Sequence, residues 1–129
     1  YLQNIIVSNG NAIYGGAIAA SRSSLTFERV TFDSNTAIMS GGALSLSNGT
    51  IAVFRKEALL FNNTAQQGGA IYVMGGSNVS WMENTIFSEN SATSSDGGAL
   101  YVGNGSSVIW TASSYFLSNS AKRVGGALH

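Results

Sequence analysis

The chain of 129 residues contains no cysteine and no proline, and only 9% of its residues are charged. Without cysteine there is no disulfide framework, so cysteine usage does not separate an oxidising from a reducing compartment. Proline lacks the N–H that a β-ladder needs, so its absence fits strands that are paired on both sides. The surface is expected to carry Ser, Thr, Asn and Gly in place of charged residues. Such a surface suits the dense stacking of coils, because neighbouring coils then do not repel each other.

The charges that are present balance, with six Lys and Arg against six Asp and Glu. This neutrality argues against nucleic acid as a partner, because its binding rests on clustered basic residues. No polybasic tract is available for an anionic membrane. No apolar run approaches the ~20 residues of a membrane span, so we expect no membrane insertion of this segment.

A short motif, Gly-Gly-Ala followed by Ile or Leu, recurs five times, at steps of 26, 27, 29 and 28 residues. The glycine pairs are Gly15 and Gly16, Gly41 and Gly42, Gly68 and Gly69, Gly97 and Gly98, and Gly125 and Gly126. An Asn precedes each pair by five to seven residues, and these are Asn9, Asn35, Asn63, Asn90 and Asn119. Three residues before each Asn stands an apolar residue, namely Ile6, Phe32, Leu60, Phe87 or Phe116. A period of this length indicates a solenoid whose coils contact mainly their neighbours.

The third repeat shows how one coil is built. Residues 68–73, 78–82 and 86–90 are expected strands, and 91–96 is expected to be the loop to the next pair. We therefore predict an all-β, parallel β-helix with about 27 residues and three strands per coil, and between four and five coils. Residues 1–129 are expected to form a single segment of it, an excerpt of a longer repeat protein, whose ends continue into further coils or abut another copy.

The apolar columns along the strands predict which side chains face the core. After the glycine pair we expect Ile18, Leu44, Leu46, Ile71, Val73, Leu100 and Val102 to point inward. In the second strand the inward column is expected to be Leu25, Phe27, Ile51, Val53, Val79, Trp81, Val108 and Trp110, and in the third Phe32, Leu60, Phe87 and Phe116. Tyr72 and Tyr101 fall on the outward column and should stack.

The two recurrent residue types have physical roles at the corners of the coil. An Asn amide carries both donors and an acceptor, so equivalent Asn residues one coil apart can form a hydrogen-bonded ladder. Glycine tolerates positive φ and lets backbone approach where a Cβ would collide. The five Asn and ten Gly are therefore predicted as structural sites.

The combination of Phe-x-x-Asn with Gly-Gly-Ala-Ile or Gly-Gly-Ala-Leu resembles the repeat of the chlamydial polymorphic membrane proteins. The first half is complete at Phe32–Asn35, Phe87–Asn90 and Phe116–Asn119, and it departs at Ile6 and Leu60. The second half is present at all five sites. The resemblance implies a right-handed parallel β-helix, used as the exported passenger of an autotransporter and often as an adhesin. A right hand is also usual for parallel crossovers.

Candidate chemical sites are few. Catalysis by a carbohydrate-active β-helix would need paired carboxylates or a metal. The acidic residues are instead expected to be solvated charges with nearby counterions; they are Glu28, Asp33, Glu57, Glu83, Glu89 and Asp96. We predict no catalytic, metal or cofactor site, and the single His, His129, is not expected to be a ligand. Sequons for glycosylation occur at Asn48, Asn62, Asn78 and Asn104. The Tyr72 and Tyr101 pair is a second candidate, as a platform for a sugar.

Three functions are consistent with the sequence. The first is a non-catalytic, secreted or cell-surface segment that displays an extended interaction surface, as an adhesin does. The second is a structural segment of an extracellular filament, and the third is a carbohydrate-active enzyme. We expect an extracellular or cell-surface location. Expected partners are adjacent coils, other copies, or the proteins and glycans of a host or neighbouring cell.

Overall fold

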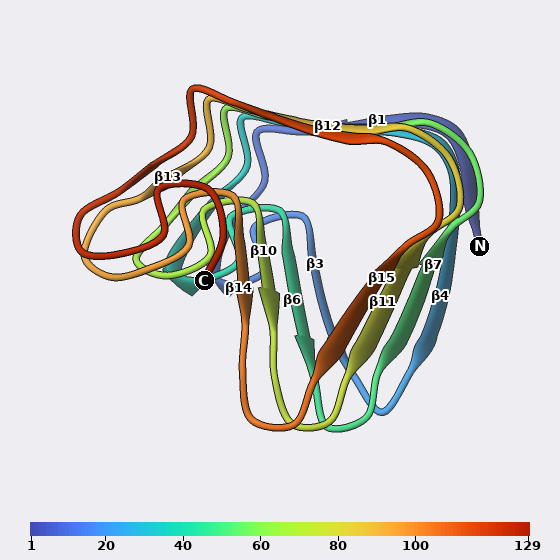
Figure 1. Ribbon diagram of the computed structural model, residues 1–129, viewed down its shortest axis with the longest axis horizontal. Coiled ribbons are helices and arrows are strands. Elements are labelled where there is room, and N and C mark those ends of the chain that lie inside the picture. Colours follow the sequence, from blue (N-terminus) through green and yellow to red (C-terminus); the bar gives the residue numbers. More distant parts are fainter.

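Strands of neighbouring coils pair in parallel throughout the chain, and the resulting coils stack into a solenoid (Figure 1). A computed structural model describes all residues, 1–129. The chain makes about four turns of about 27 residues, and it contains no helix. The predicted all-β parallel solenoid is therefore confirmed. No helix is available that could cross a membrane.

The seventeen strands form three hydrogen-bonded sheets. The strands after the glycine pairs form a four-stranded sheet of β3 (Ile18–Ser21), β6 (Leu44–Ser47), β10 (Ile71–Val73) and β14 (Leu100–Val102). The strands after the Asn positions form a five-stranded sheet of β2 (Asn11–Tyr14), β5 (Thr36–Ser40), β9 (Thr64–Ala65), β13 (Ser91–Ala92) and β17 (Ser120–Ala121).

The eight-stranded sheet covers two faces of the solenoid. One face holds β7 (Ile51–Phe54), β11 (Asn78–Trp81) and β15 (Ser107–Trp110), and the other holds β1 (Leu2–Ser8), β8 (Ala58–Phe61), β12 (Thr85–Ser88) and β16 (Ser114–Leu117). Strand β4 (Ser24–Asp33) belongs to both, because its first half pairs with β7 and its second half with β8. Two residues separate Phe27 from Val30 at this corner, and β4 runs through it without interruption. In the next coil three residues separate Phe54 from Ala58, and the strand is divided there into β7 and β8.

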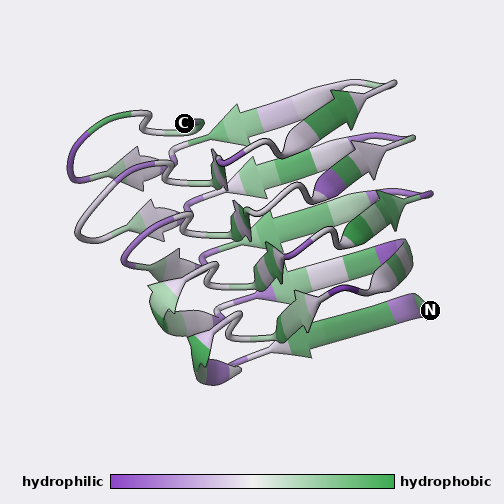
Figure 2. Ribbon diagram, turned by 90° about the horizontal axis from the view of Figure 1, so that it is seen from below, coloured by the Kyte–Doolittle hydropathy of each residue, from purple (hydrophilic) through white to green (hydrophobic).

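The three expected strands of each coil are present, and a fourth short strand follows the Asn. In the predicted loop 91–96, Ser91 and Ala92 form β13, which pairs with β9 and β17. The cause is backbone bonding between coils at the Asn itself, where the Ser91 N–H donates to the Asn63 carbonyl at 2.9 Å. The side view shows these short strands stacked at one edge of the solenoid (Figure 2).

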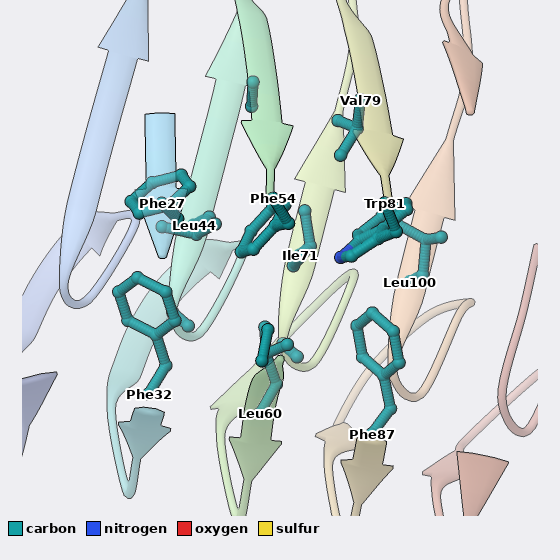
Figure 3. Packing of buried hydrophobic residues seen from close by; sticks show 14 of the residues in the cluster. Phe27, Phe32, Leu44, Phe54, Leu60, Ile71, Val79, Trp81, Phe87 and Leu100 are labelled. Carbon is teal, nitrogen blue, oxygen red and sulfur yellow. The ribbon is translucent and has the colours of Figure 1, made fainter. Parts of the chain in front are cut away.

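Aromatic side chains from the second strands stack through the core (Figure 3). Ring centroids are 4.6 Å apart between Phe27 and Phe54, 5.3 Å between Phe54 and Trp81, and 5.3 Å between Trp81 and Trp110. A second row comes from the third strands, and Phe87 meets Trp81 edge-on at 5.7 Å. Such offset and edge contacts add to the energy of burial, so neighbouring coils are held together by matched rings.

The prediction that Ile51 and Val53 face the core is wrong. Ala52 and Phe54 are fully buried instead, while Ile51 is 48% exposed. Two residues separate β3 from β4, whereas three separate β6 from β7. Ser24 therefore pairs with Ile51. One additional turn residue moves every side chain of the strand to the opposite face.

Candidate functional site

The predicted Asn ladder runs through the interior of the solenoid. Asn63 is fully buried, and its Nδ2 donates to Asn90 Oδ1 at 3.0 Å and to the Phe32 carbonyl at 2.9 Å. Its Oδ1 accepts the backbone N–H of Asn35 at 3.0 Å and the Nδ2 of Asn35 at 3.1 Å. Asn90 makes the same set of bonds with Asn119 as its next neighbour. The amide hydrogens and oxygens of both interior members are thus satisfied.

The first member predicted for this ladder, Asn9, lies outside it. The backbone N–H of Gly10 donates to Asn35 Oδ1 at 2.9 Å, and the Val7 carbonyl accepts from Asn35 Nδ2 at 2.9 Å. Asn9 is exposed and adopts φ 57° at the bend before the ladder position. The first coil is therefore shifted by one residue relative to its motif, which also leaves Ile6 70% exposed.

The first glycine of each pair occupies the left-handed region, with φ between 55° and 68°. A Cβ at these positions would lie 1.9–2.5 Å from the carbonyl oxygen three residues later. L-residues rarely adopt this conformation, and here even the space for a Cβ is missing. The glycines concerned are Gly15, Gly41, Gly68, Gly97 and Gly125.

The second glycine of each pair is required by the stacking of coils. A Cβ on Gly69 would lie 2.1 Å from the Gly98 carbonyl oxygen and 2.6 Å from the backbone of Ser91, both in the next coil. Gly16, Gly42 and Gly98 are placed in the same way. At Gly126 the nearest atom is the Asn119 carbonyl oxygen at 3.6 Å. The contact between neighbouring coils, and not the turn itself, therefore leaves no room for a Cβ on the second glycine.

A second ladder, made of hydroxyl groups, was not anticipated from the sequence. The Ser77 Oγ donates to the Met74 carbonyl at 2.7 Å and accepts the Thr50 N–H at 3.1 Å. Thr50 Oγ1 likewise accepts the Ser23 N–H at 3.4 Å, and Ser106 Oγ accepts the Ser77 N–H at 3.2 Å. The available signal was a Ser or Thr at steps of 27, 27 and 29 residues, directly before each second strand.

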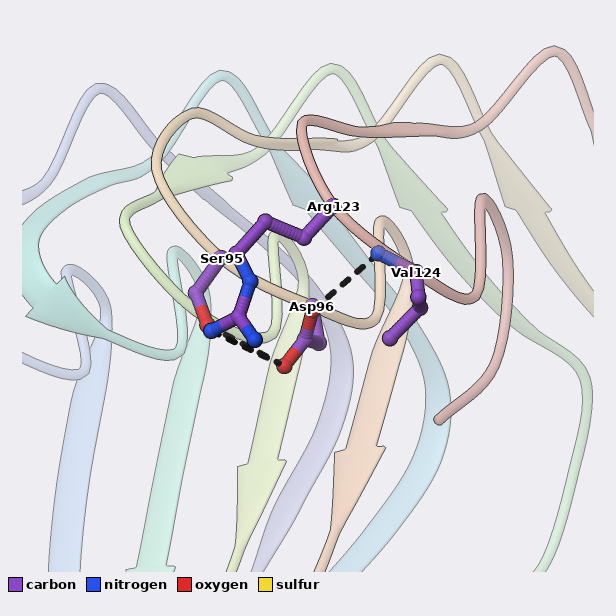
Figure 4. Close-up of polar contacts among 4 residues, drawn as sticks. All are labelled: Ser95, Asp96, Arg123 and Val124. Atoms are coloured by element: carbon purple, nitrogen blue, oxygen red, sulfur yellow. Dashed lines mark hydrogen bonds and ion pairs between the residues drawn. The ribbon is translucent and has the colours of Figure 1, made fainter.

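Asp96, the most buried acidic residue, is held by hydrogen bonds to residues of two loops (Figure 4). Asp96 is 7% exposed, and its Oδ1 accepts the Val124 N–H at 3.1 Å while its Oδ2 accepts the Ser95 hydroxyl at 3.2 Å. The guanidinium of Arg123 stands 4.0 Å away. Asp96 thus ties the loop of one coil to the loop of the next.

The other charged residues are not brought together into a reaction centre. Lys56 Nζ and Glu83 Oε1 form an exposed ion pair at 3.0 Å, a type worth little in water. No three His, Cys, Asp or Glu side chains gather where a metal ion could be held. The ring of His129 stacks on Tyr101, with centroids 5.1 Å apart.

The outer face of β8, β12 and β16 carries a groove of about 480 Å³. Its lining includes the polar residues Arg29, Glu57 and Asn84 together with Ile86 and Tyr115. Glu57 is the sole carboxylate in this lining, so the groove does not present the carboxylate pair that glycosidases use. Its chemistry is that of an apolar contact surface with a polar margin.

A smaller cavity of about 310 Å³ lies on the outer face of β3, β6 and β10. Tyr14 and Tyr72 line it together with Ala19, Ser45 and Ser47 from the strands between them. Burial raises the pKa of Tyr72, and the neighbouring phenols of Tyr101 and Tyr14 raise it further. Both effects disfavour the charged phenolate of Tyr72.

All four predicted sequons lie at the surface, since Asn48, Asn62, Asn78 and Asn104 are exposed. Asn48, Asn62 and Asn104 adopt positive φ of 51–54° at bends, and Asn78 begins β11. The Asn48 amide donates to the Ser21 hydroxyl at 3.0 Å, and the Asn62 amide to the Ser34 hydroxyl at 3.2 Å. Glycosylation of these residues remains a prediction.

The fold and its ladders define a class of protein, the parallel β-solenoids built from repeated coils. Three segments of the chain, residues 29–47, 57–74 and 84–103, match the model of the Chlamydia polymorphic membrane protein repeat. Each segment contains one ladder Asn and one glycine pair and ends at the strand that follows. These three segments are similar to that repeat, and the parallel β-solenoid is consistent with a β-helix of this kind. Neither a curated protein nor a solved structure matches the chain.

The positions of the matches separate two parts of each coil. The matched segments contain the Asn ladder and the glycine corners, which set the distance between coils. The stretches between them, 48–56 and 75–83, contain Thr50 and Ser77 of the hydroxyl ladder, the strands β7 and β11 and the rings of Phe54 and Trp81.

Proposed function

We propose that this chain is a non-catalytic segment of a secreted or cell-surface β-helix, which acts as an adhesin-like passenger and presents an extended surface to a protein partner. The repeat family supports this proposal, since its name describes membrane proteins of Chlamydia. The ladders support it further, because they make a rod whose coils are held by buried bonds while its outer faces stay free to vary.

The observation that carries the proposal is the apolar outer face of β8, β12 and β16. Ile86 is 38% exposed, Tyr115 51% and Leu117 53%, and Leu59 and Phe61 continue the same columns in half-buried positions. Exposed apolar patches of this kind mark interaction sites. Tyr and Arg are enriched in the cores of protein interfaces.

Arg29 and Glu57 border this face where it meets the neighbouring corner, and both line the groove described above. Together with the apolar columns they give the surface a hydrophobic centre and a polar edge, which is the usual anatomy of a protein interface. A protein surface is therefore the partner that this face fits.

Binding of the fluorescently labelled chain to cultured epithelial cells tests the proposal. Ile86→Ser combined with Tyr115→Ser should reduce cell binding at least about tenfold, because interface energy concentrates in a few anchors. The matched control is Ile51→Ser with Ile109→Ser, which removes two similarly exposed side chains, 48% and 56%, from the face of β7 and β15. Equal binding by the two variants, or no binding by the unmodified chain, would contradict the proposal.

A further inference from the structure

The outward column of the β3–β6–β10–β14 sheet changes abruptly from small to aromatic side chains. In register along the axis stand Ala19, Ser45, Tyr72 and Tyr101. Tyr72 stacks on Tyr101 at 5.2 Å with 13° between the ring planes, and Tyr101 stacks in turn on His129. One face of Tyr72 is thus covered by a ring. The other face borders the cavity over Ser45 and Ala19.

The cavity formed at this step is a slot between two tyrosines. Tyr14, at the end of β2, lines the same cavity and is 52% exposed. The floor consists of Ala19, Ser45 and their neighbours, whose short side chains leave the depth that a third aromatic ring would otherwise fill. At about 310 Å³ the slot is at the lower end of the range for small-molecule sites.

The floor of the slot carries serine side chains that face the cavity. Ser45 is 8% exposed and lines the cavity, so its side chain is accessible to a molecule in the slot. The hydroxyls of Ser21 and Ser47 also line the slot, whereas no charged side chain does. A serine hydroxyl can both donate and accept a hydrogen bond, so the slot offers neutral polar groups to a molecule that enters it.

We propose that this slot binds one ring of an uncharged saccharide, stacked on the free face of Tyr72 and hydrogen-bonded to the Ser45 hydroxyl. A pyranose has an apolar face of C–H groups, which packs on an aromatic ring, and a rim of hydroxyls, which needs neutral donors and acceptors. Tyr72 and Tyr14 supply the apolar surface, and Ser21, Ser45 and Ser47 supply the neutral polar groups. The site lies on a different face from the one proposed for a protein partner, so the two are independent.

Saturation-transfer NMR of the whole chain with methyl β-galactopyranoside and with N,N′-diacetylchitobiose tests the site. Ser45→Tyr is the decisive variant, because the new ring would extend the Tyr72 and Tyr101 stack by one coil and fill the slot. It should weaken saccharide binding at least about tenfold while leaving the thermal midpoint unchanged or higher. Ser80→Tyr, the same exchange on the outer face of β11, should leave binding unchanged.

Two further variants keep the test decisive if Ser45→Tyr disturbs the fold. Tyr72→Ser removes the stacking face and should abolish the transfer signal, whereas Tyr72→Phe keeps the ring and should retain most of it. Binding that is equal in the unmodified chain, Ser45→Tyr and Tyr72→Ser would overturn the proposal. Absence of binding by the unmodified chain to both saccharides, or binding only of a proline-rich peptide used as a competitor, would overturn it as well.

The same experiment separates this site from the proposed function. Ile86→Ser with Tyr115→Ser should bind both saccharides normally, since these side chains lie on another sheet. If cells are bound but saccharides are not, the slot proposal fails and the protein-binding face stands. If saccharides are bound and the face variants bind cells like the unmodified chain, the slot proposal stands and the face proposal fails.

Discussion

The Nδ2 of Asn63 donates to the Oδ1 of Asn90, one coil away, at 3.0 Å, and both side chains are fully buried. The same Oδ1 also accepts the backbone N–H of Asn63 at 3.0 Å. One amide oxygen therefore holds two donors of the preceding coil. This link fixes the distance and the register of neighbouring coils at a bend, where no regular strand pairing is available.

Replacing Asn90 with Ala should destabilise the chain by ~1–3 kcal/mol, toward the upper end of that range. The variant leaves two donors of Asn63 and the Leu60 carbonyl without partners in the interior. Asn90→Leu should be at least as destabilising. The free energy of unfolding from urea denaturation measures the effect, with the exposed Asn78→Ala as control. An unchanged midpoint in Asn90→Ala would show that the ladder does not contribute to stability.

Replacing Gly69 with Ala should cost at least about 3 kcal/mol or prevent folding, since the new Cβ meets rigid backbone of the next coil at 2.1 Å. Gly126→Ala is a matched control, because it changes the same motif position where the nearest atom is 3.6 Å away. It should alter stability by less than about 0.5 kcal/mol. Comparable losses in the two variants would mean that the motif needs glycine for a reason other than coil contact.

The repeat period alone allowed the fold class to be predicted, because a 26–29-residue step leaves few architectures other than a solenoid. Side-chain orientation was harder to predict. It depends on the count of residues in each turn, which is two before β4 (Arg22 and Ser23) and three before β7 (Asn48, Gly49 and Thr50). The same one-residue ambiguity placed Asn9 in the ladder position that Gly10 occupies.

The corrected orientation of β7 leads to a direct test. Phe54→Ala should destabilise by ~3–5 kcal/mol, because it removes a buried ring stacked between Phe27 and Trp81. Val53→Ala should cost less than about 1 kcal/mol, since this side chain points outward. Chemical denaturation of the two variants measures both values. A larger loss for Val53→Ala than for Phe54→Ala would restore the orientation predicted from the sequence.

The slot beside Tyr72 shows a different limit of sequence-based prediction. The outward position of Tyr72 and Tyr101 and their stacking could be predicted from the alternation of the strand, and both are observed. The cavity could not, because it depends on Tyr14, which is 58 residues away in the sequence and on another sheet. That Ser45 lines a cavity likewise becomes visible only when its surroundings are known.

The raised pKa of Tyr72 predicts how stability depends on alkaline pH. Burial disfavours the phenolate, so the folded-state pKa lies above the ordinary tyrosine value of 10.0. A folded state that holds its proton more tightly than the unfolded state is stabilised fully below pH 10. It loses that stabilisation as the pH rises through the folded-state value.

Tyr72→Phe keeps the ring and removes the titrating group, so its thermal midpoint should fall less steeply above pH 10 than that of the unmodified chain. Tyr115→Phe, which removes an exposed phenol, is the control and should follow the unmodified chain. Identical alkaline profiles for the Tyr72→Phe variant and the unmodified chain would show that the Tyr72 phenol is not desolvated by its place beside the slot.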